Sequence, residues 1–355
     1  MSRLEMLMKR VPHGAAALIS APHHLRYVAG FPAGESWIFV TAEAAYFLTD
    51  FRYIEQARQT VRGAECRMIS RLSEELQVLI GKHGITTVLV ESEHMSAAEL
   101  QRLRVQLPSV TVSDSGEVDG WLCEMRTVKS PDEVDKIRQA QALTEAGFDH
   151  ILPYIREGAT ERSVALELEM YIRRQGAERV AFDFIVVSGA NGSLPHGIPS
   201  DKPIARGEFI TLDFGAVVDG YHSDMTRTVA LGTVSDEQRA VYETVLTAQQ
   251  ASLAVLREGL SCVEGDAAAR RIIEQAGYGD CFGHGTGHGV GVEIHEAPRL
   301  SPHAGNTILR AGQVVTVEPG IYLPGRFGVR IEDKALITAD GCEDLTHTPK
   351  ELLCL

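Results

Sequence analysis

The sequence predicts two domains: a small α/β domain at residues 1–126 and a larger α+β domain at residues 127–355, built from two similar halves. Three observations support this division. The 355-residue length is more than one domain of usual size needs. Short apolar runs alternate with helical segments in the first third of the chain, and the remaining sequence twice shows the order helix, helix, strands.

The first domain is predicted from strand-like runs at Trp37–Val40, Tyr46–Leu48 and Thr87–Val90, which alternate with helical segments such as Ser73–Lys82. The apolar runs are short and the helical segments stand between them. This alternation is typical of a small sheet with helices packed on it.

A helix start marks the domain boundary at about residues 125–130. Ser130 can cap the helix, Pro131 suits its first position, and Glu133 completes a capping box. Apolar residues then keep mostly helical spacing, so we expect the helix to continue until Glu157-Gly158.

Three more helices carry similar start and stop signals, from Thr160 to about Gln175, from Ser235 to Glu258 and from Ser261 to about Ala276. Strand-rich sequence follows each pair of helices, so residues 130–231 and 235–337 share one order of elements. Residue identity between these halves is low, and the repeat rests on the order alone. It predicts two strand hairpins that meet across a pseudo-two-fold centre.

Charge and composition exclude several classes of function. The 34 Lys and Arg residues against 48 Asp and Glu residues give a net charge of −14, so neither nucleic acid nor a membrane surface is expected as a partner. No apolar run is long enough to span a membrane, and the N-terminus lacks the pattern of a signal peptide. Six scattered cysteines fit a reducing compartment, so we expect a cytoplasmic protein.

The first candidate site residues are two aspartates in a predicted hairpin, Phe209–Val218 and Tyr221–Leu231, with an Asp-Gly turn. If Val218 pairs with Tyr221, Asp213 lies opposite Thr226 and Asp224 lies opposite Gly215. Both carboxylates then point to one face, with α-carbons about 7–8 Å apart. A pair of metal ions would fit between them, whereas an exposed polar strand face would explain either aspartate alone.

A glycine-rich segment adds three histidines. Residues 283–291 contain five glycines, too many for a helix, which predicts extended backbone in close contact with its neighbours. His284 and His288 lie in this segment and His295 follows it. These imidazoles are candidates for metal binding or catalysis, and a loop with solvent-facing histidines is the alternative.

The second half supplies two carboxylates of its own. Glu318 and Glu332 stand in apolar strand runs, where a carboxylate is costly to bury without a cation or hydrogen bonds. Both are therefore candidate metal ligands, with Arg330 as a neighbouring positive charge. A surface ladder of Arg and Glu residues is the alternative.

Together these residues resemble the five metal ligands of the pita-bread metallopeptidases, in the order and motif context of that family. The ligands would be Asp213 and Asp224 in TLDFGA and DGYHSDMTRT, His288 in HGTGHGVG, Glu318 in EPGIY and Glu332 in VRIED. The sequence is most similar to the proline-specific branch, which contains Xaa-Pro dipeptidases (prolidases) and Xaa-Pro aminopeptidases. The segments Tyr27–Phe31 and Leu48–Tyr53 also resemble the creatinase-type N-terminal domain, so the likeness covers nearly the whole chain.

The resemblance implies a creatinase-like domain at residues 1–126 and a pita-bread catalytic domain at residues 127–355 that binds two divalent metal ions. Asp213 would bind one ion, Asp224 and Glu332 would bridge both, and His288 with Glu318 would complete the second site. Because the ligands are mostly oxygens, Mn²⁺ is expected, with Co²⁺, Fe²⁺ or Zn²⁺ as possible substitutes. Glu318 would be the general base for the attacking water.

The resemblance also assigns residues around the metals. His196 resembles the family histidine near the scissile bond, and His284 and His295 resemble histidines that contact the substrate and stabilise the tetrahedral intermediate. Tyr322 and Arg330 resemble a pair that orients a ligand aspartate. A further residue, Arg299, resembles the prolidase arginine that receives the free carboxylate of the substrate proline, with an exposed surface arginine as the alternative.

The implied function is metal-dependent hydrolysis of Xaa-Pro dipeptides. The alternatives are an Xaa-Pro aminopeptidase acting on longer peptides, a metal-dependent lyase on a non-peptide substrate, and a non-catalytic pita-bread binding module. A small proline-containing peptide is the expected partner, and the family commonly forms homodimers. Whether a loop at residues 32–37 closes its own or a partner's active site stays open.

Overall fold

The computed structural model describes residues 1–32 and 34–355, and these form two compact units, Met1–Arg126 and Thr127–Leu355. Ala33 lies outside the described residues, and with it part of the loop at residues 32–37 for which a closing role was considered. None of the helices within the described ranges is long and apolar enough to span a lipid bilayer. Each unit is described by itself below.

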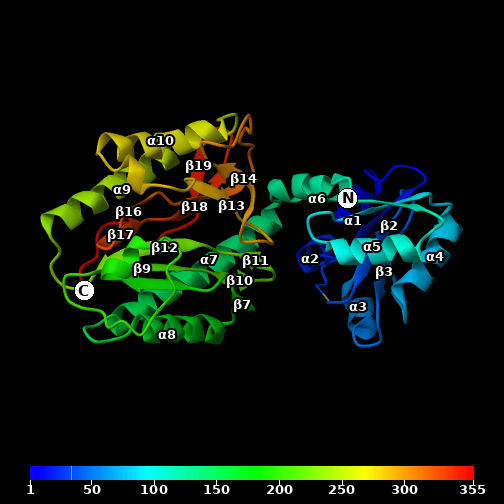
Figure 1. Ribbon diagram of the computed structural model, residues 1–355, viewed down its shortest axis with the longest axis horizontal. Coiled ribbons are helices and arrows are strands. Elements are labelled where there is room, and N and C mark those ends of the chain that lie inside the picture. Colours follow the sequence, from blue (N-terminus) through cyan, green and yellow to red (C-terminus); the bar gives the residue numbers. More distant parts are fainter. Residues whose placement is uncertain (33) are drawn as a thin grey trace. The chain divides into compact units, whose positions relative to one another are not determined.

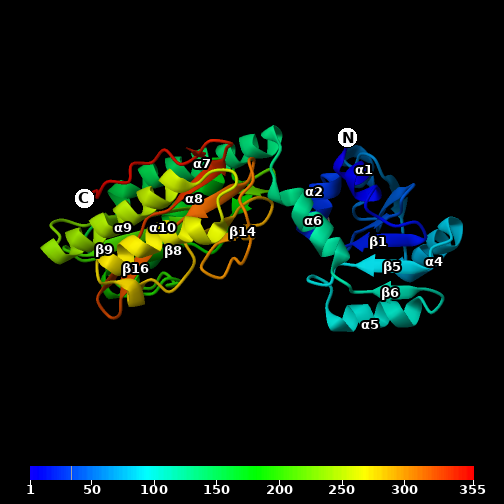
Figure 2. The same ribbon diagram turned by 90° about the horizontal axis from the view of Figure 1, so that it is seen from above.

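The first unit is an α/β fold built on one six-stranded sheet, in the order β4-β3-β2-β1-β5-β6. Its elements are, in chain order, α1 (Arg3–Met8), β1 (Ala15–Ile19), α2 (Pro22–Ala29), β2 (Trp37–Val40), β3 (Ala45–Thr49), α3 (Ile54–Thr60), β4 (Glu65–Met68), α4 (Leu72–His83), β5 (Thr87–Val90), α5 (Ala97–Gln106), β6 (Thr111–Ser113) and α6 (Glu117–Thr127). Figure 2 shows β1, β5 and β6 side by side, and these strands pair in parallel. The strand runs and the helical segment predicted from sequence all form.

The second unit carries the repeated order of elements. The first half contains α7 (Pro131–Ile151), η1 (Leu152–Tyr154), α8 (Glu161–Arg174), β7 (Arg179–Val180), β8 (Ile185–Ser188), η2 (Gly189–Ser193), β9 (Phe209–Phe214), β10 (Ala216–Val218), β11 (Tyr221–His222) and β12 (Met225–Ala230). The second half contains α9 (Asp236–Val255), α10 (Cys262–Gln275), η3 (Gly279–Cys281), β13 (Gly287–Gly289), β14 (Glu296–Leu300), β15 (Val314–Val317), β16 (Gly320–Leu323), β17 (Phe327–Arg330), β18 (Asp333–Ile337) and β19 (Cys342–Asp344).

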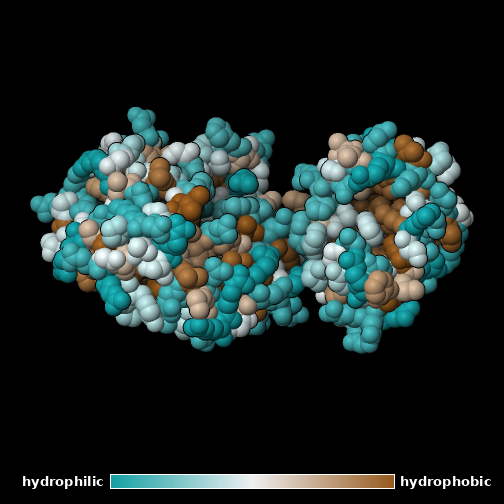
Figure 3. Space-filling model, turned by 60° about the horizontal axis from the view of Figure 1, so that its bottom comes forward, coloured by the Kyte–Doolittle hydropathy of each residue, from teal (hydrophilic) through white to brown (hydrophobic). Residues whose placement is uncertain are grey.

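Each pair of helices in the second unit packs on strands of its own half, and α9 and α10 also contact Phe209 of β9 and Ala230 of β12. Apolar side chains of α7 and α8 form one buried cluster with β8, β9 and β12, and those of α9 and α10 form another that includes β16 and β17. In Figure 1 the strands lie between α8 below and α9 and α10 above. Hydrophilic residues cover most of the surface visible in Figure 3, with small groups of hydrophobic residues between them.

The capping boxes expected at Ser130, Ser235 and Ser261 are all present, but two helices end earlier than predicted. The first helix ends at Ile151 rather than at Glu157, because Pro153 has no N–H to continue the helical hydrogen bonds. The first helix of the second half, α9, ends at Val255 rather than at Glu258. Leu256 turns extended there and buries its side chain in another apolar cluster.

The two hairpins meet along a seam formed by β12 and the segment that contains Arg330 and Glu332. The Glu332 N–H donates to the Thr226 carbonyl at 3.1 Å, and the Thr228 hydroxyl donates to the Arg330 carbonyl at 3.0 Å. The buried guanidinium of Arg227 also donates to the Glu332 carbonyl at 2.7 Å. These bonds join the first half to the second beside the candidate site.

Candidate metal centre

The five side chains expected to bind metal line one cavity of about 670 Å³ in the second unit. They come from both halves and are Asp213, Asp224, His288, Glu318 and Glu332. Apart from Glu318, these residues are at most 8% exposed. A cavity of this size is large enough for a small peptide.

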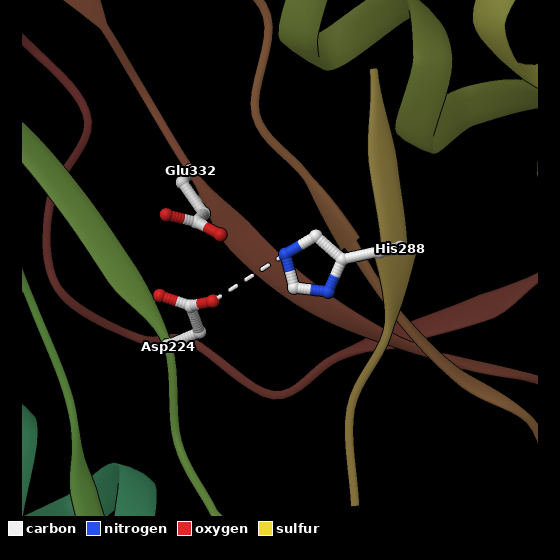
Figure 4. A group of neighbouring side chains, drawn as sticks. All are labelled: Asp224, His288 and Glu332. Carbon is white, nitrogen blue, oxygen red and sulfur yellow. Dashed lines mark ion pairs between the residues drawn. The ribbon is translucent and has the colours of Figure 1, made fainter. Parts of the chain in front are cut away.

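Three of the five form the tightest group. One ligand atom each from Asp224, His288 and Glu332 lies within 4.8 Å of the others, and Figure 4 shows these side chains converging from three segments. The Nε2 atom of His288 lies 3.6 Å from Asp224 Oδ2 and 3.3 Å from Glu318 Oε1. Four groups of the predicted set are therefore within reach of a common pair of ions.

The register of the first hairpin places the two aspartates. Val218 pairs with Tyr221 and Asp213 pairs with Thr226, as predicted. Between these pairs, the Ser223 hydroxyl also bonds to the N–H and the carbonyl of Ala216. Gly215, Ser223 and Asp224 lie outside the named strands, but Val217 pairs with His222 and Phe214 with Met225, so one register holds on both sides and places Asp224 opposite Gly215 as predicted.

The glycines around His288 allow strands to approach closely, as expected. A Cβ atom on Gly287 would lie 1.9 Å from the Thr316 carbonyl oxygen, and one on Gly289 would lie 2.3 Å from the Ala297 carbonyl oxygen. Neither space admits a side chain. The His288 N–H donates to the Thr316 hydroxyl at 3.0 Å, which fixes the imidazole at this point of β13.

A chain of hydrogen bonds runs behind Asp213. Arg330 donates to Asp213 Oδ2 at 2.5 Å and to the Tyr322 hydroxyl at 2.8 Å. That hydroxyl lies 2.9 Å from Nε2 of His284, whose Nδ1 lies 2.8 Å from the Gly285 carbonyl oxygen. The guanidinium thus bonds to the aspartate and to neither Glu318 nor Glu332, although its positive charge lowers the pKa of Glu318.

Positive groups of the chain do not balance the negative charges of the carboxylates in this centre. Burial and the charge of Asp213 raise the pKa of Asp224 well above its ordinary value, and burial and Asp224 do the same to the pKa of Glu332. Burial alone would lower the pKa of His288 and raise that of Glu318. Their mutual attraction reverses both effects and sets the pKa values to about 9 and about 2.

Divalent cations fit this arrangement. Asp213 Oδ1 and Glu332 Oε1 are buried oxygens without a hydrogen-bond partner among the described residues, and an unpaired buried carboxylate oxygen is costly. His288 Nδ1 lies 3.0 Å from the Gly289 carbonyl oxygen, a contact that leaves Nε2 directed at Asp224 and Glu318. A backbone carbonyl in this position is the usual partner of a metal-binding histidine.

We expect the metal-free protein to lose stability as the pH rises from 7 to 8. The folded pKa of His288 is about 9, so the folded state keeps a proton that the unfolded chain releases near pH 6.5. Each such proton lowers the free energy of unfolding by about 1.4 kcal/mol per pH unit. Urea midpoints of chelated protein at pH 7.0, 7.5 and 8.0 would measure the decline.

The chosen pH window lies above the opposing titration of His222 but overlaps that of Lys334, whose pKa burial lowers to about 8 and which offsets part of the decline near pH 8. Burial lowers the pKa of His222 to about 4, so this histidine makes the protein more stable as the pH rises from about 4 to 6.5. The control is His288→Asn, which should flatten the dependence above pH 7. A midpoint that rises between pH 7 and 8 in the unsubstituted protein would contradict the expectation.

The side chains expected to meet the substrate also lie at the cavity. His196, His284, His295 and Arg299 all line it. His196, His295 and Arg299 are exposed, and among residues 1–32 and 34–355 none of the three has a hydrogen-bond partner. Both ring nitrogens of His284 already have hydrogen-bond partners. In this respect His284 differs from His196 and His295.

Sequence reasoning missed several polar residues that support the ligands. The Thr226 hydroxyl donates to Glu332 Oε2 at 2.7 Å, and the Thr316 hydroxyl donates to Glu318 Oε1 at 3.2 Å. The predicted register already placed Thr226 opposite Asp213 and could have identified it. The buried ammonium of Lys334 donates to the Asp224 carbonyl at 2.9 Å, and burial lowers its pKa to about 8.

Comparison with known proteins agrees with this geometry. Residues 135–339 match metallopeptidase family M24, and residues 2–128 match the creatinase/prolidase N-terminal domain. An Xaa-Pro dipeptidase of Pyrococcus furiosus is 36% identical over 355 residues, which cover 99% of each chain. Solved structures of similar fold include an Xaa-Pro dipeptidase from Bacillus anthracis, with a TM-score of 0.94, 39% identity and 99% of both chains covered.

A second solved structure is an X-Pro aminopeptidase from Thermotoga maritima, with a TM-score of 0.91, 36% identity and 100% of both chains covered. The creatinase-type N-terminal domain and the pita-bread catalytic domain expected from sequence are therefore confirmed. The cavity gathers carboxylates and an imidazole of the kind that a family using divalent metal ions requires. The chain belongs to metallopeptidase family M24.

Proposed function

We propose that the protein is an Xaa-Pro dipeptidase that hydrolyses the bond before a C-terminal proline with the help of two divalent metal ions. Its likeness to Xaa-Pro dipeptidases over nearly the full length supports this. The observation that carries the choice of dipeptides is Arg299, an exposed guanidinium that lines the cavity beside the metal centre. A free C-terminal carboxylate is the ligand that such a guanidinium binds best.

All five ligands line the cavity, in keeping with the assignment that the resemblance implies. Asp213, Asp224, His288, Glu318 and Glu332 would together hold the two ions. Four carboxylates and one imidazole suit Mn²⁺, while Co²⁺, Fe²⁺ or Zn²⁺ could replace it according to supply.

The chain's own groups would carry the proton transfers. When bound, two divalent ions supply Lewis acidity and lower the pKa of water. Glu318 would accept the proton of the attacking water, because its carboxylate is held by Thr316 and faces His288. His196 and His295 have ring nitrogens without hydrogen-bond partners in the described ranges, so they can donate to the developing oxyanion or to the leaving amine.

His284 would act indirectly, through the Tyr322 hydroxyl. Its Nε2 atom and Arg330 both bond to the Tyr322 hydroxyl, and Arg330 in turn holds Asp213. Burial lowers the pKa of His284, which keeps the ring neutral at pH 7. A neutral ring can accept the Tyr322 proton at Nε2 while it donates from Nδ1 to the Gly285 carbonyl.

The direct test is hydrolysis of Met-Pro by chelated protein before and after addition of Mn²⁺. Rapid metal-dependent release of proline is the expected result. Met-Pro-Gly serves as the matched longer substrate, because it moves the free carboxylate one residue away from the proline. Metal-loaded protein that cleaves neither peptide would refute the proposed function.

We expect Arg299→Met to raise the KM for Met-Pro by about 10- to 100-fold, because a hydrogen bond to a charged group contributes about 1.5–3 kcal/mol. The same variant should bind Met-Pro-amide as the unsubstituted protein does, since that peptide has no terminal carboxylate. Steady-state kinetics on both substrates measure the difference. An equal change on the two substrates would contradict a carboxylate-binding role.

The second candidate is an Xaa-Pro aminopeptidase that acts on longer peptides, favoured by the likeness to the Thermotoga maritima protein. It predicts faster cleavage of Met-Pro-Gly than of Met-Pro, so the same assay separates the two functions. A non-catalytic binding module would show no stoichiometric metal uptake. A homodimer and a cytoplasmic location complete the proposal, and light scattering of the purified protein tests the first.

A further inference from the structure

One buried carboxylate, that of Glu161, holds both ends of the loop formed by residues 188–200. Glu161 is the first residue of α8 and is 0% exposed. Its Oε1 atom accepts hydrogen bonds from the N–H and the hydroxyl of Ser188 at 2.7 and 2.9 Å. Its Oε2 atom accepts from the N–H and the hydroxyl of Ser200 at 3.1 and 2.6 Å.

The same carboxylate also holds the interior of the loop. The Asn191 amide donates to both oxygens of Glu161, at 3.2 and 3.1 Å. The loop packs against β17 through glycines, since a Cβ on Gly328 would lie 2.1 Å from the Gly192 carbonyl oxygen. Glu161 therefore fixes the loop from one side while β17 supports it from the other.

The part of the loop between these bonds reaches the metal centre. Pro195, His196 and Ile198 line the cavity. The Pro195 carbonyl accepts a hydrogen bond from Arg330 at 3.1 Å. The His196 side chain has no hydrogen-bond partner among the described residues, so the backbone of the loop sets where its ring stands.

We propose that Glu161 is a positioning residue for the reaction, and that it acts by fixing the backbone that carries His196. This inference rests on the proposed function, because His196 matters only when a substrate lies in the cavity. A histidine that donates to a reacting group must be held to within about 0.5 Å. A displacement of about 1 Å can cost about 10²-fold in rate, although Glu161 itself touches no substrate.

The test is a double-mutant cycle of Glu161→Gln and His196→Ala, assayed on Met-Pro at saturating Mn²⁺. In the unsubstituted background, Glu161→Gln should lower kcat/KM by about 10²-fold, because its amide offers N–H donors where the loop also presents donors. In the His196→Ala background, Glu161→Gln should lower kcat/KM by less than about 2-fold, which is the usual error of additivity. An equal cost in both backgrounds, or no cost in the first, would overturn the proposal.

Glu91→Gln is the matched control. Glu91 is also 0% exposed, and in the first unit it accepts from the N–H and the hydroxyl of Ser20 and from the N–H of Ala21, at 2.5, 3.2 and 2.9 Å. This variant should lose a similar amount of thermal stability and keep kcat/KM within about 2-fold. An equal loss of activity in the two variants would show that general destabilisation is the cause, and the proposal would fail.

A milder variant covers the case in which Glu161→Gln does not fold. Ser200→Ala removes one hydroxyl donor from the carboxylate and should lower kcat/KM by about 5-fold, in keeping with one lost hydrogen bond. The loss should vanish when His196 is already alanine. An undiminished loss in that background would overturn the proposal.

Amide hydrogen exchange separates failure of this inference from failure of the proposed function. Residues 189–199 should exchange faster in Glu161→Gln, and not in Glu91→Gln, whether or not Met-Pro is a substrate. Unchanged exchange would refute the anchoring role. If the unsubstituted protein does not cleave Met-Pro but exchange is faster in Glu161→Gln, the dipeptidase function is refuted and the anchoring role of Glu161 is supported.

Discussion

Glu318→Gln is expected to lower kcat on Met-Pro by about 10²- to 10⁴-fold at saturating Mn²⁺, the range typical for loss of a general base. Gln keeps the size of the side chain and can still accept the hydrogen bond from the Thr316 hydroxyl. It cannot accept a proton from water near pH 7. Steady-state kinetics with the metal content of each sample measured in parallel would show the loss.

The comparison variant for this experiment is Glu237→Gln. Glu237 lies on α9 and pairs with Arg326 at the surface, so its substitution should leave kcat unchanged. The prediction concerns the rate of metal-loaded enzyme. A Glu318→Gln protein that binds metal fully and retains more than a tenth of the activity would contradict the assigned role.

Glu332→Gln is expected to change stability and activity in opposite directions. Glu332 Oε1 is buried without a partner, and burial with the charge of Asp224 raises the pKa of this carboxyl well above its ordinary value. A neutral amide removes that penalty, so the metal-free variant should gain about 1–3 kcal/mol in free energy of unfolding. Activity should disappear because a ligand proposed to hold the two ions is lost.

Urea unfolding with and without Mn²⁺ tests both parts of this prediction. Metal at 1,000 times its Kd should add about 4 kcal/mol to the free energy of unfolding of the unsubstituted protein and clearly less to the variant. Glu237→Gln again serves as the comparison and should behave like the unsubstituted protein. A metal-free Glu332→Gln protein that is less stable than the unsubstituted one would show that the carboxylate is compensated in some other way.

The register of the first hairpin was predictable because local chemistry decides it. The Asp219-Gly220 turn fixes which residues pair, and the pairs of Val218 with Tyr221 and Asp213 with Thr226 follow from it. The capping boxes were predictable for the same reason, since a cap depends on residues three positions apart. The glycines around His288 indicated close strand contact before any neighbour was known.

Features that depend on distant parts of the chain could not be predicted from one sequence. The Ser223 hydroxyl bonds to the N–H and the carbonyl of Ala216 in the middle of the hairpin, and strand patterning contains no signal for these bonds. Lys334 appears as a charge in a strand, and only the fold brings its ammonium to the Asp224 carbonyl. In the sequence Glu161 is an ordinary glutamate in the first turn of a helix. Only the fold places Ser188 and Ser200 within hydrogen-bond distance of its carboxylate.

The seam between the halves has a consequence for how such a centre is assembled. Asp213 and Asp224 come from the first half, whereas His288, Glu318 and Glu332 come from the second. Neither half alone holds all five proposed ligands, so a bound cation would act as a cross-link between the two halves. Fragments cut within the connection after Ala230 should therefore reassociate more tightly when divalent metal is supplied.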